Sequence, residues 1–328
     1  MQEALQFFLQ SLDIIICVGW LFLLAVNFRE VSSYKKYKLE PAESTGERAI
    51  SVIIPARNEE RMIESTIESV LSQTETRLEV IVVDDRSTDR TSQIIQDIQT
   101  KDSRMKLVRG RELPSGWVGK NWACHQGFEQ SHHDWILFID SDTRLERSAV
   151  ASSLEYAKKR GLDALSLVTL AEYSGFLARA VGPTLTWLIR LAYPLRKVNA
   201  PSEKIGIVIG GFLMIKRSAY IEIGGHEAVK GELVEDKEIG MNLKAHGIPY
   251  RLAIGREYAV IGLFTGEQGL WNSLRRVITN PLKRARWSKL VIAFVGLLLL
   301  LFPAAFLLVN LMIGEPSTTE LLIAAVSL

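Results

Sequence analysis

The sequence predicts an α/β fold built on an open, mostly parallel sheet. Short apolar runs of strand length alternate with segments of helical spacing along residues 50–160. Two of these runs, Glu79–Val83 and Trp135–Ile139, have almost no polar interruption, which is typical of parallel strands buried on both faces. Alternating strands and helices favour a parallel sheet with right-handed crossovers.

The expected elements follow one another along the chain. The strands are predicted at Ile50–Pro55, Glu79–Val83, Lys106–Val108 and Trp135–Ile139. The helices are predicted at Glu59–Ser72, Thr88–Ile98, Trp122–Gln130, Ser148–Arg160 and Leu233–Ala245. The first helix is supported by apolar residues that recur on one helical face, from Met62 to Leu71.

The composition limits the class of protein. A chain of 328 residues holds one large domain or two small ones, and a net charge of +2 is too small to indicate nucleic acid as a partner. The two cysteines, Cys17 and Cys124, are too few for a disulfide framework and indicate a reducing compartment.

Two apolar segments are candidates to cross a membrane. Leu290–Ile313 has no charged residue and is long enough to span a bilayer, with Pro303 inside it. Leu5–Phe28 is a second candidate that contains Asp13, and a cleaved signal peptide is its alternative. We therefore expect an anchor at residues 1–29, a helix at 289–313, and a loop with the start of a further apolar helix at 314–328.

Basic residues flank both segments on the sides that face the middle of the chain. They are Arg29, Lys35, Lys36 and Lys38 after the first segment, and Lys283, Arg284, Arg286 and Lys289 before the second. The positive-inside rule then predicts a linker at 30–47 and a catalytic domain at 48–288 on the cytoplasmic side of the plasma membrane.

The segment 176–198 mixes apolar residues with four basic ones and contains Pro183 and Pro194. Its charge argues against a membrane span. An amphipathic segment in the membrane interface and a core helix under the sheet are both open.

Polar side chains follow the first two predicted strands. Pro55-Ala56-Arg57-Asn58-Glu59 ends the first strand, and Asp84-Asp85 ends the second. Strand ends of an open parallel sheet are where ligands bind, and these groups suit a nucleotide base and ribose. Alternatively, Ser87 or Thr88 simply caps the following helix.

The pair Asp140 and Asp142 follows the strand Trp135–Ile139. Alternate residues of an extended backbone point to the same side, so both carboxylates can face one site. They would repel unless a cation lay between them, and Mg²⁺ or Mn²⁺ carrying a diphosphate meets that need. A solvated turn is the alternative.

Three further groups are candidates. Lys120 lies in the stretch Gly116–Ala123 and supplies one positive charge for a phosphate, although a surface loop is also possible. Glu235-Asp236 opens a predicted helix, whose N-terminus favours acidic residues. His226 is a candidate contact for a sugar.

These motifs, in this order, resemble the family 2 glycosyltransferases over roughly residues 48–280. The resemblance implies the GT-A fold and a nucleotide-diphospho-sugar donor. It implies that Asp140 and Asp142 are the metal-binding DxD motif and that Asp236, beside Glu235, is the general base. The implied donor-binding residues are Pro55, Ala56, Arg57, Glu59, Asp84, Asp85, Lys120, Asp140 and Gly211. We expect Asp236 to have an ordinary pKa, at which it is ionised at neutral pH.

The stretch Gly116–Ala123 and the pair Gly210-Gly211 look like those of the hopanoid-associated and carotenoid-acid members, which are membrane-attached and act on isoprenoid lipids. The chain departs from the processive synthases because residues 268–276 lack the QxxRW spacing. Arg275 and Arg276 either reach the leaving diphosphate or bind lipid headgroups.

The expected function is that of a membrane-anchored inverting glycosyltransferase, which uses Mg²⁺ or Mn²⁺ to move a sugar from a UDP- or GDP-sugar to an isoprenoid-type lipid. The alternatives are a processive exopolysaccharide synthase, a nucleotidyltransferase and a non-catalytic membrane scaffold. The sequence names neither the sugar nor the oligomeric state.

Overall fold

The structure, a computed structural model, describes residues 34–43, 49–74 and 77–265, together with Ala25, Phe28 and residues 30–32. The chain divides into two compact units, Met1–Ser33 with Ile278–Leu328, and Tyr34–Val277. Nearly all described residues belong to the second unit, which contains the predicted catalytic motifs.

Both predicted membrane segments lie outside the described residues, apart from Ala25 and Phe28. In the described part of the chain, no helix combines the length and the apolar composition needed to cross a membrane. The two spans, the region 314–328 and the orientation in the membrane therefore stay predictions.

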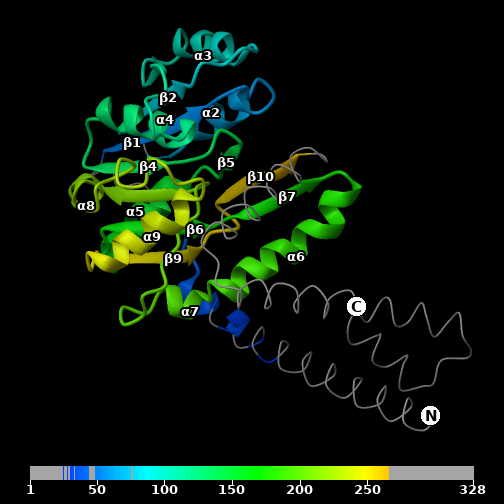
Figure 1. Cartoon of the computed structure of the whole chain (residues 1–328), viewed down its shortest axis with the longest axis vertical. Coiled ribbons are helices and arrows are strands. Elements are labelled where there is room, and N and C mark those ends of the chain that lie inside the picture. Colours follow the sequence, from blue (N-terminus) through cyan, green and yellow to red (C-terminus); the bar gives the residue numbers. More distant parts are fainter. Residues whose placement is uncertain are drawn as a thin grey trace, which may run out of the picture. The chain divides into compact units, whose positions relative to one another are not determined.

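The main sheet has seven strands in the order β3-β2-β1-β4-β8-β6-β9 (Figure 1). Their bounds are β1 Ile50–Ala56, β2 Leu78–Asp84, β3 Met105–Arg109, β4 Trp135–Phe138, β6 Ala164–Val168, β8 Leu213–Lys216 and β9 Tyr250–Ile254. β8 runs antiparallel to both of its neighbours, and every other pairing in this sheet is parallel. The predicted mostly parallel α/β fold is confirmed.

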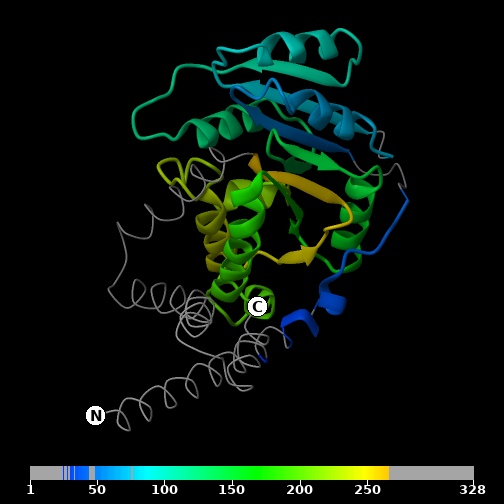
Figure 2. The same cartoon turned by 90° about the vertical axis from the view of Figure 1, so that its right-hand side faces the viewer.

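Helices cover both faces of this sheet. They are α2 Ile63–Leu71, α3 Thr91–Gln99, α4 Gly119–Glu129, α5 Ala149–Lys159, α8 Arg217–Glu222 and α9 Glu235–Ala245. Figure 2 shows α4 and α9 on one side of the sheet and α5 on the other.

Successive residues of the central strands are buried on opposite faces of the sheet. In β1, Val52 and Ile54 join the core that contains α2, α3 and α5 residues, whereas Ile53 joins the core of α4, α8 and α9. Because alternate side chains point to opposite faces, a strand covered on both sides needs apolar residues throughout. This explains the near-continuous apolar runs of β1, β2 and β4.

A second, smaller sheet was not predicted from the sequence. It has the order β5-β10-β7, with β5 at Thr143–Leu145, β7 at Leu170–Ser174 and β10 at Ala259–Thr265. β5 is very short, and a single residue separates β6 from β7, so neither β5 nor β7 has the turn signals that separate strands in a sequence.

The segment 176–198 forms two helices, α6 (Phe176–Ala192) and α7 (Leu195–Val198). α6 runs beside β7 (Figure 1), where Gly182 lies against the Tyr173 ring and the hydroxyls of Tyr173 and Thr186 hydrogen-bond at 2.7 Å. Phe176 is 84% exposed. The helix packs on the smaller sheet rather than under the main one, and its contact with a membrane stays a prediction.

Part of the predicted linker 30–47 is bound to the domain. Lys38 pairs with Ile254 at the end of β9, and the Leu39 N–H donates to the Ile254 carbonyl at 3.0 Å. The Ala42 N–H donates to Ser152 of α5 at 3.0 Å, and Leu39 is fully buried. Lys38 thus adds a single β-bridge beside β9, and the residues from Leu39 to Ala42 are held against the domain.

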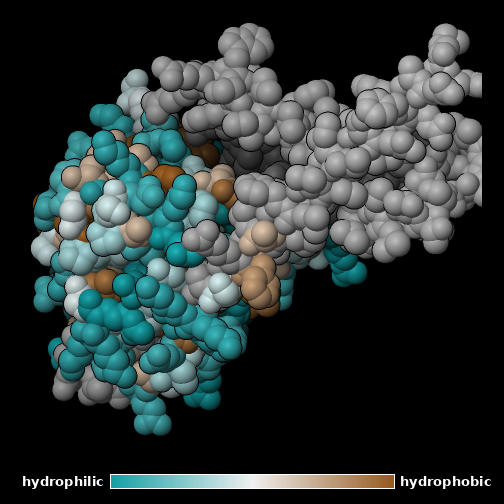
Figure 3. Space-filling view, turned by 90° about the horizontal axis from the view of Figure 1, so that it is seen from below, coloured by the Kyte–Doolittle hydropathy of each residue, from teal (hydrophilic) through white to brown (hydrophobic). Residues whose placement is uncertain are grey.

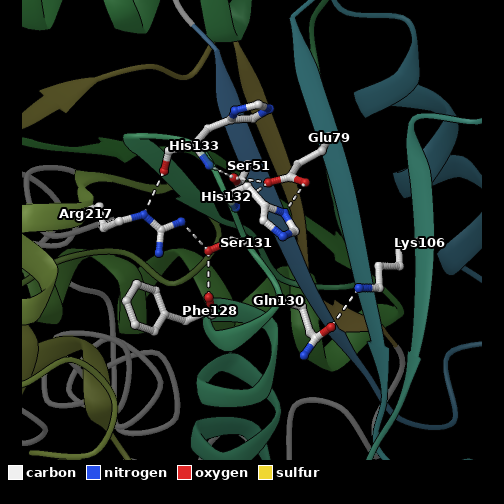
Figure 4. A network of polar contacts seen from close by, with 9 residues as sticks. All are labelled: Ser51, Glu79, Lys106, Phe128, Gln130, Ser131, His132, His133 and Arg217. Carbon is white, nitrogen blue, oxygen red and sulfur yellow. Dashed lines mark hydrogen bonds and ion pairs between the residues drawn. The ribbon is translucent and has the colours of Figure 1, made fainter.

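A polar network joins the starts of β1 and β2 to the turn before β4 (Figure 4). The Glu79 carboxylate accepts the Ser51 hydroxyl at 2.5 Å and the His132 N–H at 2.7 Å, and the Arg217 guanidinium donates to the His133 carbonyl at 3.1 Å. These bonds hold the starts of the strands together, at the end of the sheet opposite the predicted site.

Two glycines allow the chain to cross α9 in backbone contact. A Cβ on Gly206 would overlap the Gly240 carbonyl, and a Cβ on Gly240 would overlap the Ile207 amide. The crossing also brings the Val208 N–H to the Asp236 carbonyl at 3.0 Å. The segment that leads to Gly210 is therefore positioned directly by the first turn of α9.

We predict that Gly240→Ala lowers the free energy of unfolding by about 2 kcal/mol, because the added methyl group must push two backbones apart. Denaturant unfolding measures this loss. Asn242→Ala in the same helix removes atoms instead of adding them and serves as the control. Equal stability of the Gly240 variant and the parent would contradict a close crossing.

Candidate active site

The carboxyl ends of β1, β2 and β4 meet at one edge of the main sheet. β1 lies between β2 and β4, so the chain winds in opposite directions on its two sides. Ligands bind at such a switch point in open α/β sheets. The residues that follow Ala56, Asp84 and Phe138 are therefore brought together, as the sequence predicts.

Lys120 joins two of the predicted carboxylate groups. Its ammonium lies 2.7 Å from an Asp140 carboxylate oxygen and 2.7 Å from a Glu235 carboxylate oxygen. The Lys120 side chain is 34% exposed and that of Glu235 only 10%. The first turn of α4 is thus linked to the end of β4 and to the start of α9.

Asp236 completes this cluster through Gly210. The Gly210 N–H donates to the Asp236 carboxylate at 3.0 Å. A Cβ on Gly210 would lie 2.9 Å from the Lys120 ammonium, 3.0 Å from Asp236 and 3.2 Å from Asp140. Gly210 therefore sits among the charged groups, and any side chain there would press on them.

The sequence prediction selected the neighbouring glycine. A Cβ on Gly211 would lie 2.5 Å from the Ile261 side chain of β10 and 3.3 Å from the Thr143 hydroxyl. The structure thus places Gly211 in the packing between the two sheets rather than in the charged cluster. The sequence pattern Gly-Gly does not indicate which of the two glycines faces the site.

Two ionisable groups of the cluster, Asp236 and Lys120, have strongly shifted pKa values. Burial raises the pKa of Asp236 above its ordinary range, and Glu235 and Asp140 raise it further, while Lys120 opposes them. The expectation of an ordinary pKa for Asp236 is therefore wrong. For Lys120, burial opposes the charged form, but Asp140, Glu235 and Asp236 outweigh it and hold the pKa well above the usual value.

Asp142 lies beside a second group of acidic side chains. Burial, with Asp140 and Glu59 nearby, raises the pKa of Asp142 to about 7. Burial also raises the pKa of Glu59, with smaller contributions from Asp140 and Asp89 and an opposing hydrogen bond from Ser141. Such crowding of carboxyl groups disfavours their ionised forms unless a cation is added.

The assignment of a divalent metal to Asp140 and Asp142 stays a prediction. Among the described residues, no group of three or more His, Cys, Asp and Glu side chains is arranged to hold a metal ion. A site made of two carboxylates suits Mg²⁺ or Mn²⁺, which take one or two protein carboxylates and complete their shell with phosphate and water.

Asp85 lies at the end of β2 near the start of α4. Its side chain is 5% exposed and pairs with Arg86 at 2.9 Å and with Arg57 at 3.6 Å. A Cβ on Gly119 would lie 2.8 Å from its second carboxylate oxygen. Glycine at the first residue of α4 therefore leaves Asp85 room, and the ion pair of this oxygen with Arg57 is long, at 3.6 Å.

Asp84 has a structural role in the turn after β2. Its carboxylate accepts the Ser87 N–H at 3.1 Å. Ser87 and Thr88 do not cap α3, as the alternative reading of this motif had them. They bind the loop after β1 instead: the Ser87 hydroxyl accepts the Asn58 N–H at 3.0 Å, and the Thr88 N–H donates to the Asn58 side chain at 2.8 Å.

His226 lies behind the cluster rather than on its open side. It lines a cavity of about 10 Å³ together with Pro55, Lys120 and Asp236. It is 3% exposed, and its ring nitrogen Nδ1 lies 2.7 Å from the Tyr220 hydroxyl. Burial, with Lys120 and His125, lowers its pKa to about 3, so it stays neutral. A direct contact with a sugar is therefore not supported.

Asn121 was not singled out in the sequence analysis. It is fully buried in the first turn of α4, and its amide donates to the carbonyls of Val229 at 2.8 Å and Glu232 at 3.0 Å. The loop that it holds leads into α9. In the sequence, Asn121 is linked to the site only because it follows Lys120. No sequence pattern predicts that its amide binds the carbonyls of Val229 and Glu232.

Arg275 and Arg276 lie outside the described residues. The remaining predicted residues come together as follows. Pro55 lines the cavity of the cluster, Arg57 contacts Asp85, and Glu59 lies in the electrostatic neighbourhood of Asp142. Ala56 is buried at the end of β1.

The family described as Glycosyl transferase family 2 matches residues 51–224, slightly more than half of the chain. The matched region includes the ends of β1, β2 and β4 and the DxD motif, and it ends before Glu235.

Two curated relatives carry related names. The chain is 28% identical over 232 residues to the 4,4'-diaponeurosporenoate glycosyltransferase of Staphylococcus haemolyticus, covering 69% of this chain and 58% of the relative. It is 33% identical over 153 residues to the probable glycosyltransferase YdaM of Bacillus subtilis, covering 46% of this chain and 36% of the relative. The chain thus spans less than two thirds of the length of these relatives.

A solved structure, described as the mannosyltransferase PcManGT from Pyrobaculum calidifontis in complex with GDP-Man and Mn²⁺, shares the fold. The TM-score is 0.60 at 17% identity, with 97% of this chain and 90% of that chain covered. Together with the family match, this likeness confirms the GT-A type of α/β fold.

We predict that the metal-free protein becomes less stable as the pH rises toward about 7. The folded-state pKa of Asp142 is about 7, far above its value in an unfolded chain. The native state therefore binds more protons between the two values, and stability falls as the pH increases through that window. We expect the free energy of unfolding to fall by only about 2 kcal/mol across this window, because the partial exposure of Asp142 lets solvent screen the charges.

Chemical unfolding at a series of pH values in the presence of a chelator measures this slope. Asp142→Asn should reduce it, whereas Asp97→Asn, at an exposed position of α3, should not. Stability that increases with pH across the same window would contradict the crowding of carboxyl groups.

Proposed function

Because this chain belongs to glycosyl transferase family 2, we propose that it moves a sugar from a nucleotide-diphospho-sugar to a membrane lipid. One observation carries this proposal. Asp236 and Glu235 lie in one cluster with Asp140 of the DxD motif, joined by Lys120, at the switch point of the sheet. A donor bound by the DxD motif would therefore have its sugar next to a carboxylate.

The donor's nucleoside is proposed to bind at the ends of β1 and β2. The second oxygen of Asp85 would accept a hydrogen bond from a base or ribose, since its ion pair with Arg57 is long, at 3.6 Å. Gly119 leaves space above this oxygen. The start of α4 also directs its backbone N–H groups toward this region, which suits an anionic ligand.

Asp140 and Asp142 are the residues proposed to hold Mg²⁺ or Mn²⁺. The raised pKa of Asp142 supports a cation there, since a cation would relieve the repulsion among Asp142, Asp140 and Glu59. When bound, the metal would neutralise charge on the donor diphosphate as it leaves. The solved mannosyltransferase with GDP-Man and Mn²⁺ supports this pairing of metal and nucleotide.

Asp236 is the proposed general base. The acceptor oxygen would attack the anomeric carbon of the sugar, the bond from that carbon to the diphosphate would break, and Asp236 would take the acceptor proton. This direct displacement inverts the anomeric centre. In its ionised form, a carboxylate of raised pKa is a stronger base, and the positive charge of Lys120 favours that ionised form of Asp236.

The acceptor is proposed to be an isoprenoid-type lipid at the cytoplasmic face of the plasma membrane. The names of the relatives in Staphylococcus support a carotenoid-acid type of acceptor. The predicted membrane segments at 1–29 and 289–313 would keep the domain beside this lipid. A nucleotidyltransferase would not need Asp236 in the cluster, which makes that alternative less suitable.

We predict that Asp236→Asn keeps donor binding and lowers turnover by about 1,000-fold, because an amide cannot accept the proton. Asp142→Ala should instead impair binding itself, because it loses the metal-dependent part of donor binding. A thermal-shift screen with nucleotide sugars, with and without Mn²⁺, measures binding, and release of nucleoside diphosphate measures turnover.

Each variant is the control for the other. The proposal fails if Asp236→Asn turns over like the parent, or if no nucleotide sugar raises the melting temperature of the parent in the presence of a divalent metal.

A further inference from the structure

Basic residues are unevenly distributed along this chain. Residues 31–39, 173–202 and 249–256 contain three, four and two Lys or Arg residues and no Asp or Glu. The whole chain has a net charge of only +2, so the rest of it carries a net negative charge.

The fold brings these three segments together at the β9 edge of the main sheet. Lys38 pairs with Ile254, and the Arg251 guanidinium lies over the Tyr37 ring at 5.6 Å. The Arg190 guanidinium, near the end of α6, lies over the Tyr34 ring at 5.7 Å.

α7 is attached to the same edge. The side chain of Asn199, directly after α7, exchanges hydrogen bonds of 2.8 and 2.9 Å with the backbone of Leu252 in β9. Leu195 and Val198 of α7 are buried in the core that also contains Tyr37. We call the basic residues of these neighbouring segments the basic face: Lys35, Lys36, Lys38, Arg190, Arg196, Lys197, Arg251 and Arg256.

The charged ends of this basic face reach solvent. Lys35, Lys36, Arg196, Lys197 and Arg256 are exposed. Figure 3, seen from below, shows a described surface on which hydrophilic residues predominate, with several scattered brown patches. A hollow of about 230 Å³ lies within the face, lined by Tyr34, Lys35, Lys38, Arg256 and Tyr258 among others. Glu257 also lines it, and it pairs with Lys38 at 2.8 Å.

We propose that the basic face is a docking surface for an anionic phospholipid bilayer. The proposal rests on the membrane attachment in the proposed function. The first predicted membrane segment ends at residue 29, so Lys35 and Lys36 follow it within a few residues, where headgroups lie. Basic residues beside a cytoplasmic leaflet are attracted by its negative surface potential. The half-buried Tyr34 ring, with an apolar body and a polar tip, suits the same interface.

Docking on this face has a consequence for the active site. β9 runs parallel to β6, and β6 runs in the same direction as β4, because β8 is antiparallel to both. The carboxyl end of β9 therefore lies at the same end of the sheet as the carboxyl ends of β1 and β4. A bilayer held by the basic face would lie near this end of the sheet, which carries Asp236 and where a lipid acceptor must enter.

The test uses the full chain in lipid nanodiscs with and without an anionic phospholipid. A fluorophore at Ser202→Cys, exposed just beyond α7, reports the approach of this face to a nitroxide-headgroup lipid by its quenching. Cys17→Ser removes one native thiol, and Cys124 is buried and not labelled. We expect stronger quenching with the anionic lipid and reversal at high salt.

The triple variant Lys35→Gln, Lys36→Gln and Lys197→Gln should abolish the lipid effect. Each charge contributes roughly five-fold to the docked population, or about 100-fold for three. The matched control neutralises three exposed basic residues near β3 at the opposite edge of the sheet, with Lys101→Gln, Lys106→Gln and Arg109→Gln, and should behave like the parent.

Equal quenching in both lipids, or an unchanged lipid effect in the triple variant, would overturn the proposal. So would salt-sensitive binding of single-stranded RNA by this face without any lipid effect. Donor binding in the thermal-shift assay separates the outcomes. Its retention with no lipid effect removes only the docking surface, whereas its absence in the parent removes the proposed function.

Discussion

The Lys120 ammonium is the interaction on which the site depends. It lies between Asp140 and Glu235, which are far apart in the sequence, and it attracts Asp236 as well. Three carboxylates gathered at one sheet edge would repel one another without it. A single cation at the start of α4 therefore lets Asp140 and the proposed base lie in one cluster.

The surrounding backbone is built to keep this arrangement. Gly210 leaves no side chain between the ammonium and the carboxylates, and its N–H holds Asp236. Asn121, next to Lys120, holds the loop that leads into α9, and the Gly206–Gly240 crossing positions the chain that arrives at Gly210. Lys120 is thus positioned by α4, and Glu235 and Asp236 are positioned by α9. The two helices pack in the same core.

The sequence predicts the sheet and the carboxylates because both depend on local patterns. Apolar runs report strands buried on both faces, and the ends of parallel strands meet at one edge, so Asp85 and Asp140 had to lie near each other. The partners of Lys120, the choice of Gly210 over Gly211 and the raised pKa of Asp236 depend on three-dimensional distances that no local pattern carries. The smaller sheet was missed because β5 is too short to give a periodic signal.

The central claim is that Lys120 neutralises the cluster, and stability measurements on Lys120→Met and Lys120→Arg test it most directly. The account predicts that Lys120→Met lowers the free energy of unfolding at neutral pH by about 2 kcal/mol, a discounted value because a third of the side chain is exposed. The loss should shrink as the pH falls and the carboxyl groups take up protons, and Lys120→Arg should retain most of the stability. A methionine variant as stable as the parent at neutral pH, with the same pH dependence, would contradict the claim.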